Sequence, residues 1–139
     1  MGSIEVICGS MFSGKTEQLI KRIEELQSTN LNYKVFKPEI DKRSGESKIQ
    51  THNKKSIDAI TIKNADEIIN QSNDCDVIAI DEAQFFTEDI VEVCNTLANK
   101  GIRIIIAGLD MDYLGKPFGP MPKLMAIAED VIKVHAICT

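Results

Sequence analysis

Short apolar runs that alternate with amphipathic stretches extend along the whole chain. Five runs rich in Val and Ile are nearly continuous, which is typical of strands buried in a parallel sheet; they cover residues 4–8, 34–36, 77–80, 102–107 and 131–137. Between them, apolar side chains recur at helical spacing, and the predicted helices cover residues 19–26, 65–70, 90–98 and 120–129. Strands that alternate with helices predict an α/β fold, in which a parallel five-stranded sheet carries helices on both faces.

One stretch departs from this alternation. Residues 39–56 (EIDKRSGESKIQTHNKKS) are polar apart from two isolated isoleucines, so we expect a long loop there. Loops longer than about 12 residues inside compact domains are usually functional lids or disordered segments. The pattern leaves open both a lid over a site and a solvated loop.

A glycine-rich motif follows directly on the first predicted strand. It reads GSMFSGKT, a glycine, four residues and then Gly-Lys-Thr, which is the spacing of a phosphate-binding loop. Glycines let the backbone wrap tightly and point several N–H groups at phosphate oxygens, and the dipole of the following helix points the same way. The lysine would reach the outer phosphates, and the threonine hydroxyl would ligate Mg²⁺. The predicted phosphate site consists of Gly9, Ser10, Met11, Phe12, Ser13, Gly14, Lys15 and Thr16.

Two carboxylates follow the third predicted strand. Asp81 comes directly after the run Val-Ile-Ala-Ile, and Glu82 comes next. Ligands bind at the carboxyl ends of parallel strands, so Asp81 is predicted to hold Mg²⁺ together with Thr16. Glu82 is then left to act as a general base on a hydroxyl group or a water molecule. Among P-loop NTPase folds, such an Asp-Glu pair suggests the RecA-like branch, in which the strand order is 5-1-4-3-2 and another strand separates the two motif strands.

Size and charge narrow the function classes. The chain has 139 residues, 43% of them hydrophobic, which suits one compact domain. Its net charge of −5 argues against a binder of nucleic acid polymers, because that binding depends on clustered Lys and Arg. The sequence shows neither a signal segment nor a run of the ~18 apolar residues that span a membrane, so we expect a cytoplasmic protein without a membrane partner. Four scattered cysteines without a Cys-x-x-Cys pair favour reduced thiols over disulfides.

Four motifs together point to a known family. The segments GSMFSGKT, VFKPEIDKR, VIAIDEAQFF and AGLDMDYLGKPFGPMPKL occur in this order, and their sequences and spacings resemble those of type II thymidine kinases. The resemblance covers nearly all 139 residues. It implies transfer of the γ-phosphoryl group of ATP to the 5′-hydroxyl of thymidine, which gives dTMP in nucleoside salvage for DNA synthesis. It also implies a homotetramer that is inhibited by the triphosphate dTTP.

The resemblance also implies roles for residues beyond the phosphate-binding loop. Glu82 matches the family's proton acceptor, and Tyr113 stands where the family more usually has Phe. The residues that would line the donor nucleotide and its Mg²⁺ are Asp41, Lys42, Arg43, Asp81, Glu82, Ala83 and Gln84. A flat pyrimidine needs aromatic and apolar walls, and those that would enclose the thymine ring are Met11, Phe85, Leu109 and Tyr113. We expect Phe86 and Phe118 to be packing residues.

The chain departs from the family at its end. The family continues into a small domain with two zinc-binding cysteine pairs, and Cys138 matches the first of these cysteines. One thiolate cannot complete a tetrahedral Zn²⁺ site, so structural zinc is expected only in a longer form. We therefore expect a P-loop kinase domain over residues 1–137, with residues 138–139 as the start of a zinc domain that is otherwise absent. The sequence leaves open whether the chain is truncated, partly disordered or naturally short.

Two other functions stay open at this point. A chain without the zinc domain could bind nucleotides and yet lack kinase activity. A P-loop ATPase that works as a motor or a switch would share Asp81 and Glu82, but it would not explain the segment GLDMDYLGKPFGP.

Overall fold

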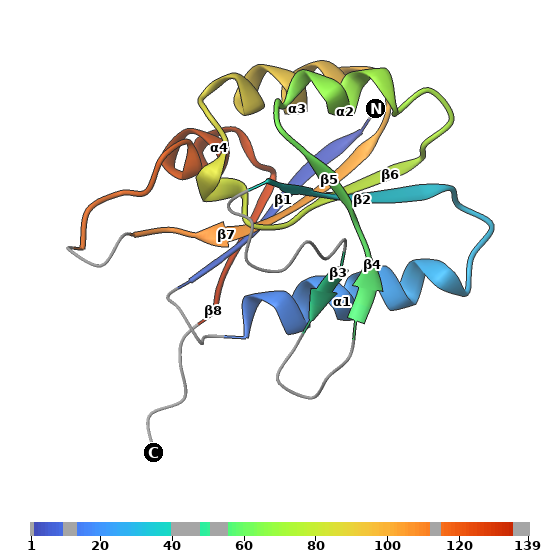
Figure 1. The fold of residues 1–139 in the computed structure, drawn as a ribbon, viewed down its shortest axis with the longest axis horizontal. Helices are drawn as coiled ribbons and strands as arrows, with labels where there is room; N and C mark the ends of the chain where they lie inside the picture. Colours follow the sequence, from blue (N-terminus) through green and yellow to red (C-terminus); the bar gives the residue numbers. More distant parts are fainter. Residues whose placement is uncertain (1, 10–13, 40–47, 51–55, 112–114, 135–139) are drawn as a thin grey trace.

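Strands and helices alternate along the chain, as the apolar pattern predicts (Figure 1). The computed structural model describes residues 2–9, 14–39, 48–50, 56–111 and 115–134. The strands are β1 (Ser3–Gly9), β2 (Tyr33–Pro38), β3 (Lys48–Gln50), β4 (Ser56–Asp58), β5 (Ile60–Ile62), β6 (Val77–Ile80), β7 (Arg103–Leu109) and β8 (Asp130–Val134). The helices are α1 (Lys15–Gln27), α2 (Asp66–Asn70), α3 (Asp89–Asn99) and α4 (Met121–Ile127), with one 3₁₀ turn, η1 (Ala83–Phe85).

Six strands form one sheet in the order β5-β2-β6-β7-β1-β8, and every neighbouring pair is parallel. The five strands that the sequence predicts are β1, β2, β6, β7 and β8. Numbered along the chain, these five lie in the predicted order 5-1-4-3-2. The predicted strand count is wrong, because β5 adds a sixth strand at the edge beside β2. Its three residues, Ile-Thr-Ile, are too few for an apolar pattern to distinguish from a loop.

Helices cover both faces of the sheet, with α1 on one side and α2, α3 and α4 on the other (Figure 1). Side chains alternate between the two layers along each strand. On β7, for example, Ile105 and Ala107 pack with α1, whereas Ile104 and Ile106 pack with the other helices. The four buried residues of α1 are those that the helical spacing predicts: Leu19, Ile20, Ile23 and Leu26. None of the described helices is long and apolar enough to cross a membrane.

The stretch predicted to be a long loop is not loop throughout. Lys48–Gln50 forms β3, which pairs antiparallel with β4, Ser56–Asp58. This two-stranded sheet lies on the same side of the main sheet as α1 (Figure 1). The interpretation of 39–56 as loop is therefore wrong at β3 and at Ser56. Strand β3 has a single isoleucine, Ile49. It is defined by its pairing with β4 rather than by an apolar pattern of its own.

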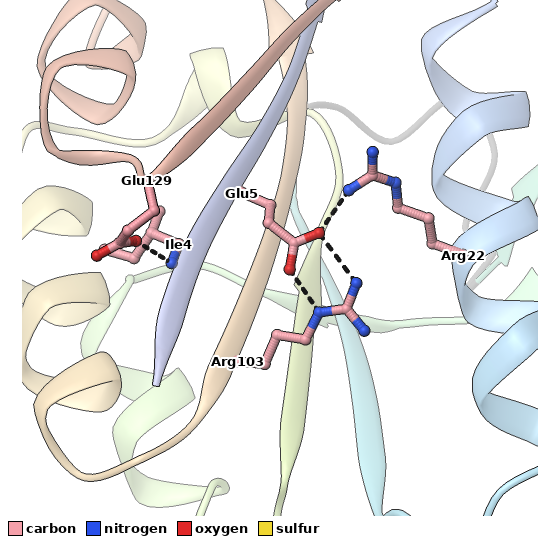
Figure 2. A network of polar contacts seen from close by, with 5 residues as sticks. All are labelled: Ile4, Glu5, Arg22, Arg103 and Glu129. Carbon is pink, nitrogen blue, oxygen red and sulfur yellow. Dashed lines mark hydrogen bonds and ion pairs between the residues drawn. The ribbon is translucent and has the colours of Figure 1, made fainter. Parts of the chain in front are cut away.

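A half-buried carboxylate ties α1 to the sheet in the amino-terminal half of β1. Glu5 accepts hydrogen bonds from the guanidinium groups of Arg22, on α1, and Arg103, on β7 (Figure 2). In the same region the Glu129 carboxylate accepts a hydrogen bond from the Ile4 N–H at 2.6 Å. Because Arg22 reaches Glu5 from α1 and Arg103 reaches it from β7, we interpret this network as holding α1 in place beside β1. Lys15 and Thr16 lie in the first turn of α1, so the network also helps to hold these two residues in place.

Cys8, Cys75 and Cys94 are free thiols, which confirms the expectation of reduced cysteines for the part of the chain that the structure describes. Burial raises the pKa of the Cys94 thiol to about 12, so this side chain stays neutral and acts as a small apolar core residue. Cys138 lies outside the described residues.

Candidate active site

The carboxyl ends of three central strands bring the predicted motifs to one edge of the sheet. β1 ends at Gly9, β7 at Leu109 and β6 at Ile80. Gly9 is paired with Leu109, and Ile80 with Ile106 one strand further on. Because all three strands are parallel, the segments that follow them emerge on the same side. The phosphate-binding motif, the Asp-Glu pair and the segment after Leu109 therefore share one edge.

The phosphate-binding motif enters α1 through a left-handed glycine. Gly14 has φ 93° and ψ 17°, and its carbonyl accepts a hydrogen bond from the Gln18 N–H at 3.1 Å. Glycine adopts this backbone conformation without the steric cost that a side chain would bring. Lys15 and Thr16 follow in the first turn of α1, and both are half-buried. The predicted phosphate ligands Ser10, Met11, Phe12 and Ser13 lie outside the described residues.

Asp81 is a buried carboxylate at the end of β6, with 5% of its surface exposed. Its N–H donates to the Phe36 carbonyl of β2 at 2.9 Å. Burial and then the neighbouring Glu82 charge raise the pKa of Asp81 from its ordinary value of 3.8 to about 7. The Glu82 backbone N–H and the charges of Lys15 and Lys37 work in the opposite direction. Asp81 thus carries a charge that the surrounding protein only partly compensates.

We expect Asp81→Asn to stabilise the protein at alkaline pH, in EDTA and without nucleotide. The pKa of Asp81 is about 7 in the folded protein and 3.8 ordinarily, so its contribution to stability is fully present below pH 3.8 and is lost as the pH rises through about 7. Above pH 8, the ionised Asp81 therefore lowers the free energy of unfolding by about 4 kcal/mol relative to acid pH. Urea unfolding of both proteins from pH 4 to pH 8 measures the effect, which should grow with pH.

The exposed Asp74 provides the matched control for this experiment. Asp74→Asn changes the same chemical group in solvent and should leave the free energy of unfolding within about 0.5 kcal/mol of the wild type. An Asp81→Asn protein that unfolds more easily than the wild type at pH 8 would contradict the assignment of Asp81 as a poorly compensated buried charge.

Glu82 has an unusual backbone. With φ 56° and ψ 39°, it is the one non-glycine residue of left-handed conformation among the described residues. Residues held in this region cost about 1–3 kcal/mol and persist where surrounding structure fixes them, often at functional sites. The 3₁₀ turn η1 begins directly afterwards at Ala83. This turn directs the chain away from the end of β6 and leaves the Glu82 side chain half-buried at the edge.

Gln84 connects Glu82 with β7. Its amide nitrogen donates to Oε2 of Glu82 at 3.0 Å, and its amide oxygen accepts from the Leu109 N–H at 3.0 Å. The side chain is 2% exposed. The resemblance predicts that Gln84 belongs to the nucleotide-lining segment, and the structure brings it together with the Glu82 carboxylate.

Aromatic side chains follow Gln84 in the sequence. Phe85 is 44% exposed, and its ring meets that of Phe118 edge-to-face, with centroids 5.6 Å apart. Leu109 is half-buried at the end of β7. Phe86 is 6% exposed within the apolar core, which confirms its prediction as a packing residue. Phe118 is half-buried and packs on Phe85.

Several predicted site residues lie outside the described part of the chain, and their roles stay predictions. They are Ser10, Met11, Phe12, Ser13, Asp41, Lys42, Arg43, Tyr113 and Cys138. The predicted residues that the structure brings to one edge are Gly9, Gly14, Lys15, Thr16, Asp81, Glu82, Ala83, Gln84, Phe85 and Leu109.

Sequence reasoning missed three charged residues at this edge. Lys37 follows Phe36 on β2 just as Asp81 follows Ile80 on β6, and Phe36 is paired with Ile80. The charge of Lys37 acts on Asp81. The pairing of β2 with β6 is the signal that would have identified Lys37 as a site residue. Asp110, 8% exposed, follows β7 and forms an ion pair with Lys133 of β8 at 3.1 Å. That pair joins strands that are distant in sequence, and no local signal marks it.

The residues at this edge suit a magnesium ion. Mg²⁺ prefers carboxylate and hydroxyl oxygens, usually one or two from the protein beside phosphate oxygens and water. The Asp81 carboxylate and the Thr16 hydroxyl are donors of this kind, and the raised pKa of Asp81 reflects a charge that a cation would compensate. The donor set therefore fits Mg²⁺ bound together with a nucleotide phosphate.

Comparison with known proteins identifies the family. The family model described as "Thymidine kinase" matches residues 2–139. The chain belongs to the thymidine kinase family. It is 53% identical over 137 residues to the thymidine kinase of Bacteroides fragilis strain YCH46, an alignment that covers 99% of this chain and 69% of that protein. The thymidine kinase of Porphyromonas gingivalis strain ATCC 33277 is 52% identical, with 99% and 67% covered. That of Bdellovibrio bacteriovorus is 50% identical over 138 residues, with 99% and 68% covered.

The fold of this thymidine kinase family member also has a likeness among solved structures. The X-ray structure of the Legionella pneumophila ATPase DotB superimposes with a TM-score of 0.55, and the match covers 90% of this chain and 34% of DotB. At 19% sequence identity, this likeness supports the P-loop fold alone and says nothing about the substrate.

Proposed function

We propose that this protein transfers the γ-phosphoryl group of ATP to the 5′-hydroxyl of thymidine, giving dTMP and ADP in nucleoside salvage. Membership of the thymidine kinase family supports this reaction. The observation that carries the proposal is the shared edge of β1, β6 and β7, where the charges of Lys15 and Glu82 act on Asp81. A phosphate-binding cation, a metal-binding carboxylate and a proton acceptor are the parts that this chemistry needs.

On the donor side, Gly9 to Thr16 would bind the phosphates of ATP through backbone N–H groups and the Lys15 ammonium. Asp41, Lys42 and Arg43 would approach the triphosphate, and Ala83 and Gln84 would line the same site. Asp81 and Thr16 would hold Mg²⁺, which supplies positive charge to the phosphate oxygens when bound.

On the acceptor side, Met11, Phe85, Leu109 and Tyr113 would enclose the thymine ring. The exposure of Phe85 and its packing on Phe118 support this role, because an aromatic wall must face the ligand and be held from behind. The 5′-oxygen of thymidine forms a bond to the γ-phosphorus while the bond to the bridging oxygen of ADP breaks. Glu82 accepts the proton of the 5′-hydroxyl, and Lys15 stabilises negative charge on the phosphates.

Further properties of the family are proposed for this protein on its membership alone. They are a homotetrameric assembly, inhibition by dTTP, a cytoplasmic location and a structural Zn²⁺ that includes Cys138 when its partner ligands are present. Each rests on family membership rather than on a contact in this structure.

A direct assay tests the proposal. We expect the purified protein with Mg-ATP to convert thymidine to dTMP, with ADP formed in equal amount, as measured by chromatography. Under the same conditions adenosine, which has a larger base, should give no nucleotide product, because the pocket is expected to fit a pyrimidine. Mg-ATP binding without any thymidine phosphorylation would instead support the alternative of a nucleotide-binding domain without kinase activity.

A further inference from the structure

We propose that Gln84 is a positioning residue, whose side-chain amide orients the Glu82 carboxylate and links it to the acceptor-side segment that begins at Leu109. This inference rests on the proposed role of Glu82 as the proton acceptor. It gives Gln84 a role in turnover that differs from lining the ATP site.

Two hydrogen bonds define the position of the Gln84 amide. One joins Nε2 to Oε2 of Glu82, and the other joins Oε1 to the Leu109 N–H, each at 3.0 Å. The Leu109 N–H can only donate, so the amide oxygen must face it. The NH₂ group then faces the Glu82 carboxylate, which is an acceptor when ionised. Both ends of the amide are thus satisfied in a side chain that is 2% exposed.

The space for Gln84 depends on glycine at two places, one beside its side-chain amide and one beside its backbone carbonyl. A Cβ atom at Gly108 would lie 2.8 Å from Oε1 of Gln84 and 2.8 Å from Sδ of Met121. A Cβ atom at Gly119 would lie 2.5 Å from the Gln84 carbonyl oxygen, and Gly119 also has φ +52°. Both glycines belong to the segment AGLDMDYLGKPFGPMPKL, so this segment packs directly on Gln84.

The backbone at Glu82 makes the contact between the two side chains possible. Residues two positions apart point in different directions on a regular helix and do not face each other. Glu82 does not lie on such a helix, because its left-handed conformation comes directly before the 3₁₀ turn η1. The strained residue is therefore the one whose side chain Gln84 holds.

A tethered carboxylate suits proton transfer. With Oε2 bound to the Gln84 amide, the Oε1 atom of Glu82 is left to meet the 5′-hydroxyl of the acceptor. Losing the tether lets the carboxylate sample other rotamers, and misplacement of a catalytic group by about 1 Å can cost ~10²-fold in rate. In the alternative role, Gln84 only anchors the backbone of Leu109, and its hydrogen bond to Glu82 has no effect on turnover.

Two substitutions separate these roles. Gln84→Glu keeps an oxygen to accept the Leu109 N–H but places a second carboxyl group against Glu82. Gln84→Met keeps the approximate volume and loses both hydrogen bonds. We expect both variants to lower kcat by about 10- to 100-fold, with the larger part of the loss in kcat rather than in KM for ATP. If one variant folds poorly in thermal unfolding, the other carries the test, because Gln84→Glu retains the structural anchor and Gln84→Met adds no charge.

A double-mutant cycle with Glu82→Gln completes the experiment. If Gln84 acts through Glu82, Gln84→Met should change the residual kcat of the Glu82→Gln protein by less than about twofold, since the group that it positions is already gone. Equal loss from Gln84→Met in both backgrounds, or wild-type turnover by Gln84→Glu, would overturn the inference. Undiminished turnover by Glu82→Gln alone would instead reject Glu82 as the base in the proposed function.

Discussion

Glu82→Gln should lower kcat by ~10²-fold or more, the usual range for removal of a general base, while the affinity for Mg-ATP stays within a few fold. The amide has the size of the carboxylate and keeps an oxygen that can accept from Gln84, but it cannot take the proton of the 5′-hydroxyl. The phosphate-binding residues lie on β1 and α1, so donor binding should survive. Steady-state kinetics and calorimetry with Mg-ATP measure the two effects separately.

The control for this experiment is Glu92→Gln. Glu92 is an exposed carboxylate on α3, in the layer of helices that covers the α2, α3 and α4 face of the sheet. Its replacement removes the same charge from the protein and should leave kcat unchanged. Turnover of Glu82→Gln that equals the wild-type rate would show that another group accepts the proton.

The second large effect is expected at the donor site, where Lys15→Ala should abolish detectable Mg-ATP binding and turnover. Lys15 begins α1, and its charge acts on Asp81 and Cys8 at the carboxyl edge of the sheet. A charge-assisted hydrogen bond contributes about 1.5–3 kcal/mol, which corresponds to roughly one to two orders of magnitude in affinity, and a P-loop lysine meets more than one phosphate oxygen.

Lys21→Ala is the matched control, because Lys21 is an exposed lysine on the same helix. Both substitutions leave the buried face of α1 intact, so both proteins should fold, which thermal unfolding checks before calorimetry. Calorimetry that finds the same Mg-ATP affinity in Lys15→Ala and Lys21→Ala would remove the phosphate-binding role from this motif.

Much of the fold could be predicted because its strands are buried on both faces. β1, β6 and β7 pack against helices above and below, so their sequences are continuous apolar runs that stand out from the helices. The phosphate-binding motif adds a strand, a turn and a helix in a fixed order. The strand order followed from the Asp-Glu pair at the end of β6, which is a property of the motif rather than of the apolar pattern.

The remaining elements depend on strand pairing rather than on patterns of their own. β5 is a three-residue strand that pairs with β2 at the edge of the sheet, and β3 exists through its pairing with β4. Neither has enough residues for a periodicity. The predicted end of the last helix at residue 129 was also too late, since α4 ends at Ile127 and Ala128 is extended.

For the site, the sequence identifies reacting groups more readily than the residues that support them. Asp81 and Glu82 follow a strand and are acidic, and both facts are visible in the sequence. The left-handed backbone of Glu82 is not visible in the sequence. Nor is the hydrogen bond from Leu109 to Gln84, because these two residues are 25 positions apart. The same holds for the Asp110–Lys133 ion pair.

The position of β1 between β7 and β8 has a consequence for how the protein is made. β1 leaves the ribosome well before both of its neighbours, since Ser3 pairs with Arg103 and Glu5 with Asp130. At ~5–20 residues per second, this strand therefore waits roughly 5–20 s for its first neighbour. Such late, long-range pairing slows folding and leaves an apolar segment open to aggregation in the meantime. The strand that leads into the phosphate-binding loop is thus synthesised well before its two neighbours, so the edge that would bind the nucleotide is completed only after β7 and β8 have been made.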